Sequence, residues 1–120
     1  MNGEGYPGSA EYNKLVRDGI PRIIEESGSV PETKELTKEE KIGELVKKVE
    51  EERQELIQAI EKGDNEEIKK ELSDIMEVVR SLGKEYGISL EEITVLMEER
   101  KKKRGGFDEG IFLIRTREKE

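Results

Sequence analysis

The sequence contains no cysteine and no histidine, and the two absences exclude several kinds of chemistry. Without cysteine the chain has no disulfide framework and no thiolate nucleophile. Without histidine it has no imidazole for acid–base catalysis or for binding a metal. A catalytic acid, a base or a metal ligand is therefore to be sought among its 30 aspartate and glutamate residues.

Hydrophobic residues are also scarce: they make up 32% of the 120 residues, against 43% that are charged. Such a chain forms one small domain with a modest core, so we expect a homodimer or homotetramer to complete the burial. The net charge of −8 suits cation binding and argues against nucleic acid or an anionic membrane as the main partner. No apolar run matches a membrane span or a signal peptide, and we predict a cytoplasmic location.

Helix-capping patterns predict an all-α fold. Pro21 and Gly28 bracket a short helix near residues 20–27. Three longer helices are each opened by a capping pair and ended by glycine, namely Thr37 with Glu40 to Gly63, Asp64 with Glu67 to Gly87, and Ser89 with Glu92 to Gly105-Gly106. We predict a helical bundle built around an antiparallel helix pair, with short extended segments at both ends of the chain.

The two ends of the chain carry weaker signals. Residues 1–10 are rich in glycine and show no periodicity, so we expect a flexible tail there. The apolar run at residues 111–114 is expected to form either a strand or a packing arm.

Two stretches, "VEEERQELIQAI" and "EIKKELSDIMEVV", place carboxylates beside the apolar stripes of the central helices. At about 100° per residue, Glu52 and Glu55 lie on one flank of the first stripe. Glu51 lies about 160° from the centre of that stripe and points to solvent. On the next helix Glu71 lies within the stripe and Asp74 on its flank.

The turn at Gly63-Asp64 makes these helices antiparallel neighbours, and Glu55 and Glu71 then both lie roughly 11–12 Å from it. The four carboxylates therefore converge at one height. They would repel one another without a cation, and oxygen ligands suit Mg²⁺ first and Mn²⁺ second. In the competing interpretation they are only surface groups of a non-catalytic helical dimerisation or adaptor protein.

The acidic pattern and its flanks resemble a known family. "EERQE", followed after fifteen residues by "ELSD", is similar to the EExxE…ExxD motif of the MazG-like, all-α nucleoside triphosphate pyrophosphohydrolases. "YNKLVRDGIP" and "KKKRGGF…GIFL" resemble the phosphoribosyl-ATP pyrophosphohydrolase-like branch, whose members are described as house-cleaning enzymes. The resemblance covers roughly residues 12–114, and we assign residues 11–120 to a single MazG-like helical domain.

The resemblance implies that Glu52, Glu55, Glu71 and Asp74 bind Mg²⁺. It also implies cleavage of a nucleoside triphosphate between the α and β phosphates, giving a monophosphate and pyrophosphate, with non-standard nucleotides as possible targets. Phosphoribosyl-ATP is the alternative substrate. Because histidine and cysteine are missing, one of the acids or the metal itself must activate water, and Glu55 and Glu52 are the candidate catalytic residues.

A triphosphate also needs fixed positive charge. Lys101 and Arg104, at i and i+3 on the last predicted helix, are candidates, although basic residues there also complement the helix dipole. Phe107 is expected either to stack on the base or to anchor the small core.

Two further cations match the family's N-terminal motif. Lys14 and Arg17 are candidate substrate-binding residues. The alternative for Arg17 is a structural role, in which it acts together with Asp18 to tie the N-terminal segment down.

Overall fold

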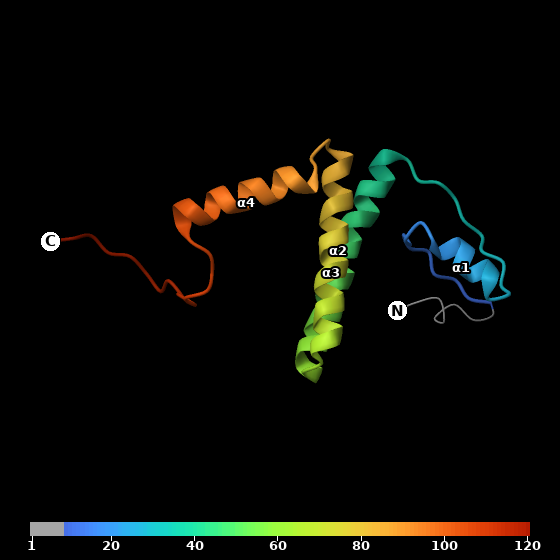
Figure 1. Cartoon of the computed structure of the whole chain (residues 1–120), viewed down its shortest axis with the longest axis horizontal. Helices are drawn as coiled ribbons and strands as arrows, with labels where there is room; N and C mark the ends of the chain where they lie inside the picture. The colour runs from blue at the N-terminus through green and yellow to red at the C-terminus, as the bar shows by residue number, and fades with distance from the viewer. Residues whose placement is uncertain (1–8) are drawn as a thin grey trace.

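The computed structural model describes residues 9–120, and this part of the chain forms four α-helices (Figure 1). They are α1 (Ile20–Glu26), α2 (Lys38–Lys62), α3 (Asn65–Glu85) and α4 (Leu90–Arg104). No strand occurs within residues 9–120, so the predicted all-α class is confirmed. The apolar residues 111–114 form no strand and are 74–87% exposed, so they do not pack on this chain. The predicted tail falls mostly on residues 1–8, outside the described residues.

The predicted caps position the helices. The Thr37 hydroxyl accepts a hydrogen bond from the Glu40 N–H group, and the Glu40 carboxylate accepts one from the Thr37 N–H group. Ser89 and Glu92 form the same reciprocal box at the start of α4. Asp64 caps α3 through its carboxylate, which accepts from two N–H groups of the first turn. The capping rules therefore located the starts of the three long helices correctly.

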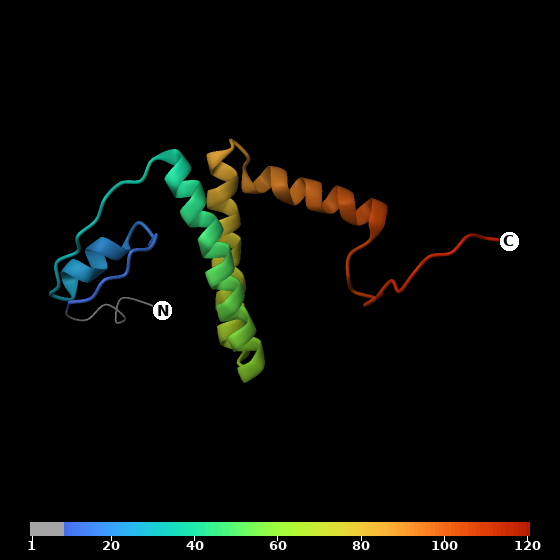
Figure 2. The ribbon, with the colours of Figure 1, turned by 180° about the vertical axis from the view of Figure 1, so that it is seen from behind.

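Helices α2 and α3 form an antiparallel hairpin (Figures 1 and 2). The turn is tight because Gly63 adopts a left-handed conformation, with φ 68° and ψ 26°, that strains other residues. Leu45, Ala59 and Val78 are the buried hydrophobic residues of the described chain. The core is thus a thin seam inside one hairpin.

Helix α4 leads away from this hairpin, and α1 lies on the hairpin's other side (Figures 1 and 2). The turn from α3 to α4 is close-packed at Gly83, where an added Cβ would lie 2.9 Å from the backbone oxygen of Ile88. A side chain at this position would clash with backbone, so glycine is required for the direction that α4 takes.

The fold is open. Its accessible surface is 10703 Å², compared with about 6,600 Å² for a compact monomer of this mass. Its radius of gyration is 19.2 Å, compared with about 13.6 Å expected for the same length. Many large apolar side chains of the three long helices are exposed, including Val46, Val49, Ile60, Leu72, Met76, Leu96 and Met97. In the described chain, no helix has both the length and the apolarity that a bilayer crossing requires.

Candidate metal and active site

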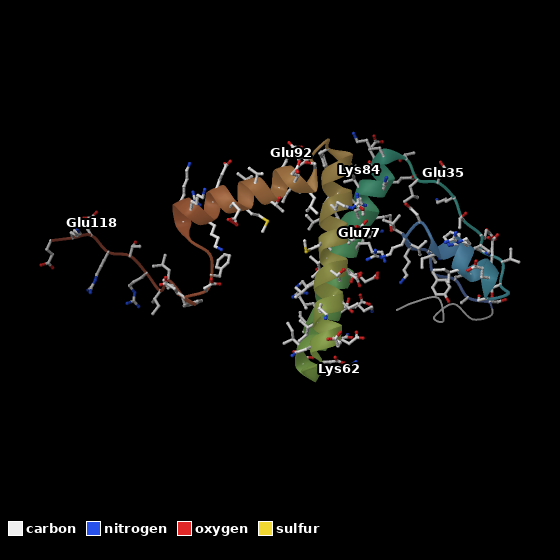
Figure 3. The ribbon with its side chains drawn as sticks, in the orientation of Figure 1. Glu35, Lys62, Glu77, Lys84, Glu92 and Glu118 are labelled. Atoms are coloured by element: carbon white, nitrogen blue, oxygen red, sulfur yellow. The ribbon has the colours of Figure 1, made fainter. Side chains whose placement is uncertain are left out.

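The hairpin brings together the carboxylates that were predicted to converge. Carboxylate oxygens of Glu52, Glu71 and Asp74 lie within 4.8 Å of one another, and so do those of Glu51, Glu52 and Glu55. Glu52 belongs to both groups, so the five residues form one carboxylate cluster. Oxygen-tipped side chains follow the hairpin on the side that faces the N-terminal segment (Figure 3).

Two members of the carboxylate cluster are buried. Glu52 is 7% exposed and Glu71 is 4% exposed. Oε2 of Glu52 and Oε1 of Glu71 are buried without a hydrogen-bond partner. The other oxygen of Glu71 lies 3.8 Å from Nζ of Lys70, which is itself partly exposed. Buried carboxylate oxygens without partners are costly, so the cluster needs a proton or a cation.

The pKa values of the two buried carboxylates also indicate that the cluster needs a proton or a cation. Burial, together with the neighbouring Glu55 carboxylate, raises the pKa of Glu52 from 4.5 to about 8. Burial also raises the pKa of Glu71, and the charge of Glu55 adds to the rise. Without a metal the cluster therefore retains a proton at neutral pH.

This proton makes the stability of the metal-free protein pH-dependent. The folded state holds a proton that the unfolded chain releases, so the free energy of unfolding should fall as pH rises from about 4.5 to about 8. We expect a loss of about 1–3 kcal/mol, less than the pKa shift alone would give, because solvent at the open side of the cluster screens the charges. Denaturant unfolding in EDTA at about pH 5.5 and about pH 8.5 measures it.

The matched control is Glu52→Gln, which should remove most of this dependence. The chain has no histidine, so few other groups titrate in the same range. An unchanged dependence in the variant would show that Glu52 is not its source.

The donor set fits a divalent cation. Every donor is a carboxylate oxygen, the ligand type that Mg²⁺ and Mn²⁺ prefer. A cation would satisfy the partnerless oxygens of Glu52 and Glu71 and offset the repulsion between the carboxylates.

The expectation that Glu51 points to solvent is wrong. Its side chain is 34% exposed and lies between two lysines, with Oε2 3.1 Å from Lys48 Nζ and 3.7 Å from Lys14 Nζ. The N-terminal segment lies against this face of α2 and supplies Lys14. A helical projection considers one helix alone, so it cannot show that the N-terminal segment covers this face of α2.

Arg17 reaches the carboxylate cluster from the same segment. Its Nη2 donates a 2.7 Å hydrogen bond to Oδ1 of Asp74 on α3. The contact joins residues 57 positions apart and ties the segment to the hairpin. Of the two roles considered for Arg17, this contact matches the structural one, although the carboxylate partner is Asp74 rather than the exposed Asp18.

The basic end of α4 is not brought to the carboxylate cluster of its own chain. Lys101 and Arg104 lie at the end of α4, which leads away from the hairpin (Figure 1). Both are exposed, and Phe107 is 98% exposed. Phe107 therefore does not anchor the core of this chain.

Lys47 and Lys48 were not singled out from the sequence, yet both line a hollow that Glu51 of the carboxylate cluster also lines. Lys48 is 3 residues from Glu51 and pairs with it, and Lys47 pairs with Glu44 at the same spacing. The i, i+3 spacing was a usable signal. It did not stand out because such pairs are common on any charged helix.

The fold and the site define an all-helical protein with a carboxylate cluster between two antiparallel helices. Residues 17–101 match the family model described as phosphoribosyl-ATP pyrophosphohydrolase. The chain belongs to this family, within the MazG-like all-α pyrophosphatase superfamily, and is a hydrolase that acts on phosphoanhydride bonds. Comparisons with curated proteins and with solved structures gave no significant match.

Proposed function

We propose that this protein is a Mg²⁺-dependent nucleoside triphosphate pyrophosphohydrolase. It cleaves between the α and β phosphates and releases a nucleoside monophosphate and pyrophosphate, clearing non-standard nucleotides from the cytoplasm. The observation that carries the proposal is the pair of buried, partnerless oxygens of Glu52 and Glu71, which face the same cluster from two helices. Membership of a pyrophosphohydrolase family supports it.

In this proposal Glu52, Glu55, Glu71 and Asp74 hold Mg²⁺, or Mn²⁺ as a substitute. The bound cation stabilises negative charge that develops on the phosphates and the leaving pyrophosphate. Both buried carboxylates, Glu52 and Glu71, contribute one oxygen that has no other partner.

Glu55 is the proposed general base, with Glu52 as its neighbour in the same group. Glu55 is less buried than Glu52, so water reaches it more easily. It accepts a proton from the water that attacks the α phosphorus. The bond from that phosphorus to the bridging oxygen breaks, and pyrophosphate leaves with its electron pair. Lys14 and Arg17, which border the cluster, contact the phosphates. Arg17 keeps its hydrogen bond to Asp74 and uses other N–H groups of its guanidinium for the phosphate.

Phosphoribosyl-ATP is a second candidate substrate, favoured by the description of the matching family model. It carries the same triphosphate, so the same carboxylates and the same bond cleavage apply. The two candidates differ only in what binds beyond the α phosphate.

We further propose a homodimer or homotetramer. The chain exposes about 4,000 Å² more surface than a compact monomer of its mass, which is ample for its share of an obligate interface, since such interfaces bury about 2,000–5,000 Å² counted over both partners. Helix α4 carries its basic end away from its own acidic cluster (Figure 2). In the oligomer, Lys101, Arg104 and Phe107 of one copy complete the site of another copy. Opposite charges favour this pairing.

The test is pyrophosphate release from standard and damaged nucleoside triphosphates and from phosphoribosyl-ATP, each with Mg²⁺, Mn²⁺ and EDTA. We expect pyrophosphate and a matching monophosphate only with metal, and a rise in melting temperature on adding metal. No release and no thermal shift would favour the helical adaptor instead.

A further inference from the structure

A hollow lined by lysines adjoins the carboxylate cluster. It has a volume of about 180 Å³ and lies between the N-terminal segment and α2. Its polar lining consists of Asn13, Lys14, Glu44, Lys47, Lys48 and Glu51. This volume corresponds to about six water molecules, which is room for two linked phosphate groups.

Three ammonium groups line this hollow from two directions. Lys47 and Lys48 come from α2, and Lys14 comes from the N-terminal segment. Nζ of Lys47 lies 2.9 Å from a carboxylate oxygen of Glu44. The lining itself carries one more positive than negative charge, three lysines against two glutamates, in a chain whose overall charge is −8. The other carboxylates of the adjoining cluster are the ones assigned to the cation, which would offset their charge. A local positive site in an acidic protein favours an anionic ligand.

One oxygen, Oε2 of Glu51, holds two of these lysines. It lies 3.1 Å from Nζ of Lys48 and 3.7 Å from Nζ of Lys14. Lys48 is unusually covered for a lysine, with a side chain only 19% exposed. The Lys48–Glu51 contact alone would be an ordinary ion pair on the surface of one helix. The Lys14–Glu51 contact is not of this kind, because Lys14 lies far earlier in the chain.

Glu51 also belongs to the carboxylate cluster, with oxygens within 4.8 Å of Glu52 and Glu55. It can therefore pair with the lysines or turn toward a cation. With a cation bound at the cluster, the Glu51 carboxylate would turn toward it, and the ammonium groups of Lys14 and Lys48 would lose their anion. A phosphate group in the hollow replaces it, and its charge-assisted hydrogen bonds are strong.

We propose that this hollow is the subsite for the terminal pyrophosphate portion of the substrate, bound by Lys14, Lys47 and Lys48. Glu51 couples the subsite to the cation, so cation and phosphate each strengthen the binding of the other. The subsite recognises the β and γ phosphates, and it therefore selects triphosphates over monophosphates whatever the base. This inference rests on the proposed pyrophosphohydrolase function.

The test uses magnesium pyrophosphate as the probe and isothermal titration calorimetry on the full chain. The double variant Lys14→Gln/Lys48→Gln should bind it at least about ten-fold more weakly than the wild type. Lys69→Gln is the matched control, because Lys69 is an exposed lysine of α3 that pairs with Glu66 at the same i, i+3 spacing. The control should bind like the wild type.

A second readout separates the subsite from the cation site. Binding of Mn²⁺ alone, followed by electron paramagnetic resonance, should be unchanged or tighter in the double variant, since Glu51 loses its competing lysines. If the double variant is poorly folded, Lys47→Gln replaces it, because Lys47 is 76% exposed, and its affinity for the probe should fall about three-fold.

If Lys14→Gln/Lys48→Gln, or Lys47→Gln in its place, binds magnesium pyrophosphate as tightly as the wild type, the proposed subsite is wrong. It is also wrong if Lys69→Gln loses as much affinity for the probe as the subsite variants do. Either result can occur while the wild type still hydrolyses nucleotides, in which case only the subsite fails. A wild type that releases no pyrophosphate from any nucleotide refutes the proposed function, whatever the lysine variants bind.

Discussion

Replacing Glu71 by glutamine is expected to lower pyrophosphate release about 100- to 1,000-fold and to raise the stability of the metal-free protein at pH 8. The loss of activity follows because an amide supplies no negative charge to a cation. The gain in stability follows because Glu71 is 4% exposed, one of its oxygens has no partner, and burial raises its pKa. Opposite effects on activity and stability are typical of a residue kept for function.

Two measurements check this expectation. Steady-state pyrophosphate release with Mg²⁺ gives the activity, and urea unfolding in EDTA gives the free energy of unfolding. We expect the latter to rise by about 1–3 kcal/mol at pH 8, since glutamine removes a buried charge and can donate to a neighbouring carboxylate. The thermal shift caused by Mg²⁺ should shrink together with the activity.

Glu61→Gln is the control, because Glu61 lies on the exposed face of α2 near its end. It changes the net charge by the same amount and should alter neither activity nor metal response. Similar losses in Glu71→Gln and Glu61→Gln would mean that overall charge is responsible, and the role assigned to the carboxylate cluster would then be wrong.

The hairpin and its carboxylates were predictable from the sequence because local rules determine them. The capping boxes of Thr37 and Ser89 and the left-handed Gly63 act within a few residues of themselves. The spacing of Glu52 and Glu71 from that turn then sets their height on facing helices. Each step depends on neighbours in the sequence or on one tight turn.

The remainder of the site depends on contacts between distant segments. The Arg17–Asp74 hydrogen bond joins residues 57 positions apart, and nothing in the pattern around Arg17 specifies Asp74 over Asp18. The contact between Lys14 and Glu51 also joins distant segments, and the sequence pattern does not specify it either. Helical periodicity assigns a face to each residue, but it contains no information about which segment covers that face.

The direction of α4 could not be inferred either, because it depends on one backbone contact. The Gly83 position lies against the Ile88 oxygen, and this close approach fixes the turn into α4. A compact bundle would have placed Lys101 and Arg104 near the carboxylates of the same chain. The observed turn directs them away from the hairpin, so whether Lys101 and Arg104 add to the phosphate-binding lysines of the same chain or serve another copy is a question about subunits.

Mixing two inactive variants is expected to restore activity if those cations come from another copy. Glu71→Gln lacks a working carboxylate cluster, whereas Lys101→Gln/Arg104→Gln lacks the basic end of α4. Each alone should lose at least about 100-fold in kcat/KM. In a mixed dimer one site joins the intact cluster of one copy to the intact α4 of the other. An equal mixture after co-refolding should therefore regain about a quarter of the wild-type activity.

The control mixes Glu71→Gln with Glu52→Gln, whose defects both lie in the carboxylate cluster of one chain. Every site in that mixture is damaged, so no activity should return. The two variants differ in net charge, so ion-exchange chromatography can show that mixed oligomers have formed. If the first mixture stays inactive although mixed oligomers are present, the basic end of α4 serves its own chain, and α4 must then move toward the hairpin when substrate binds. Recovery of activity would explain the open fold. The exposed apolar faces would then pack against a second copy, and the basic end of α4 would complete the carboxylate site of that copy.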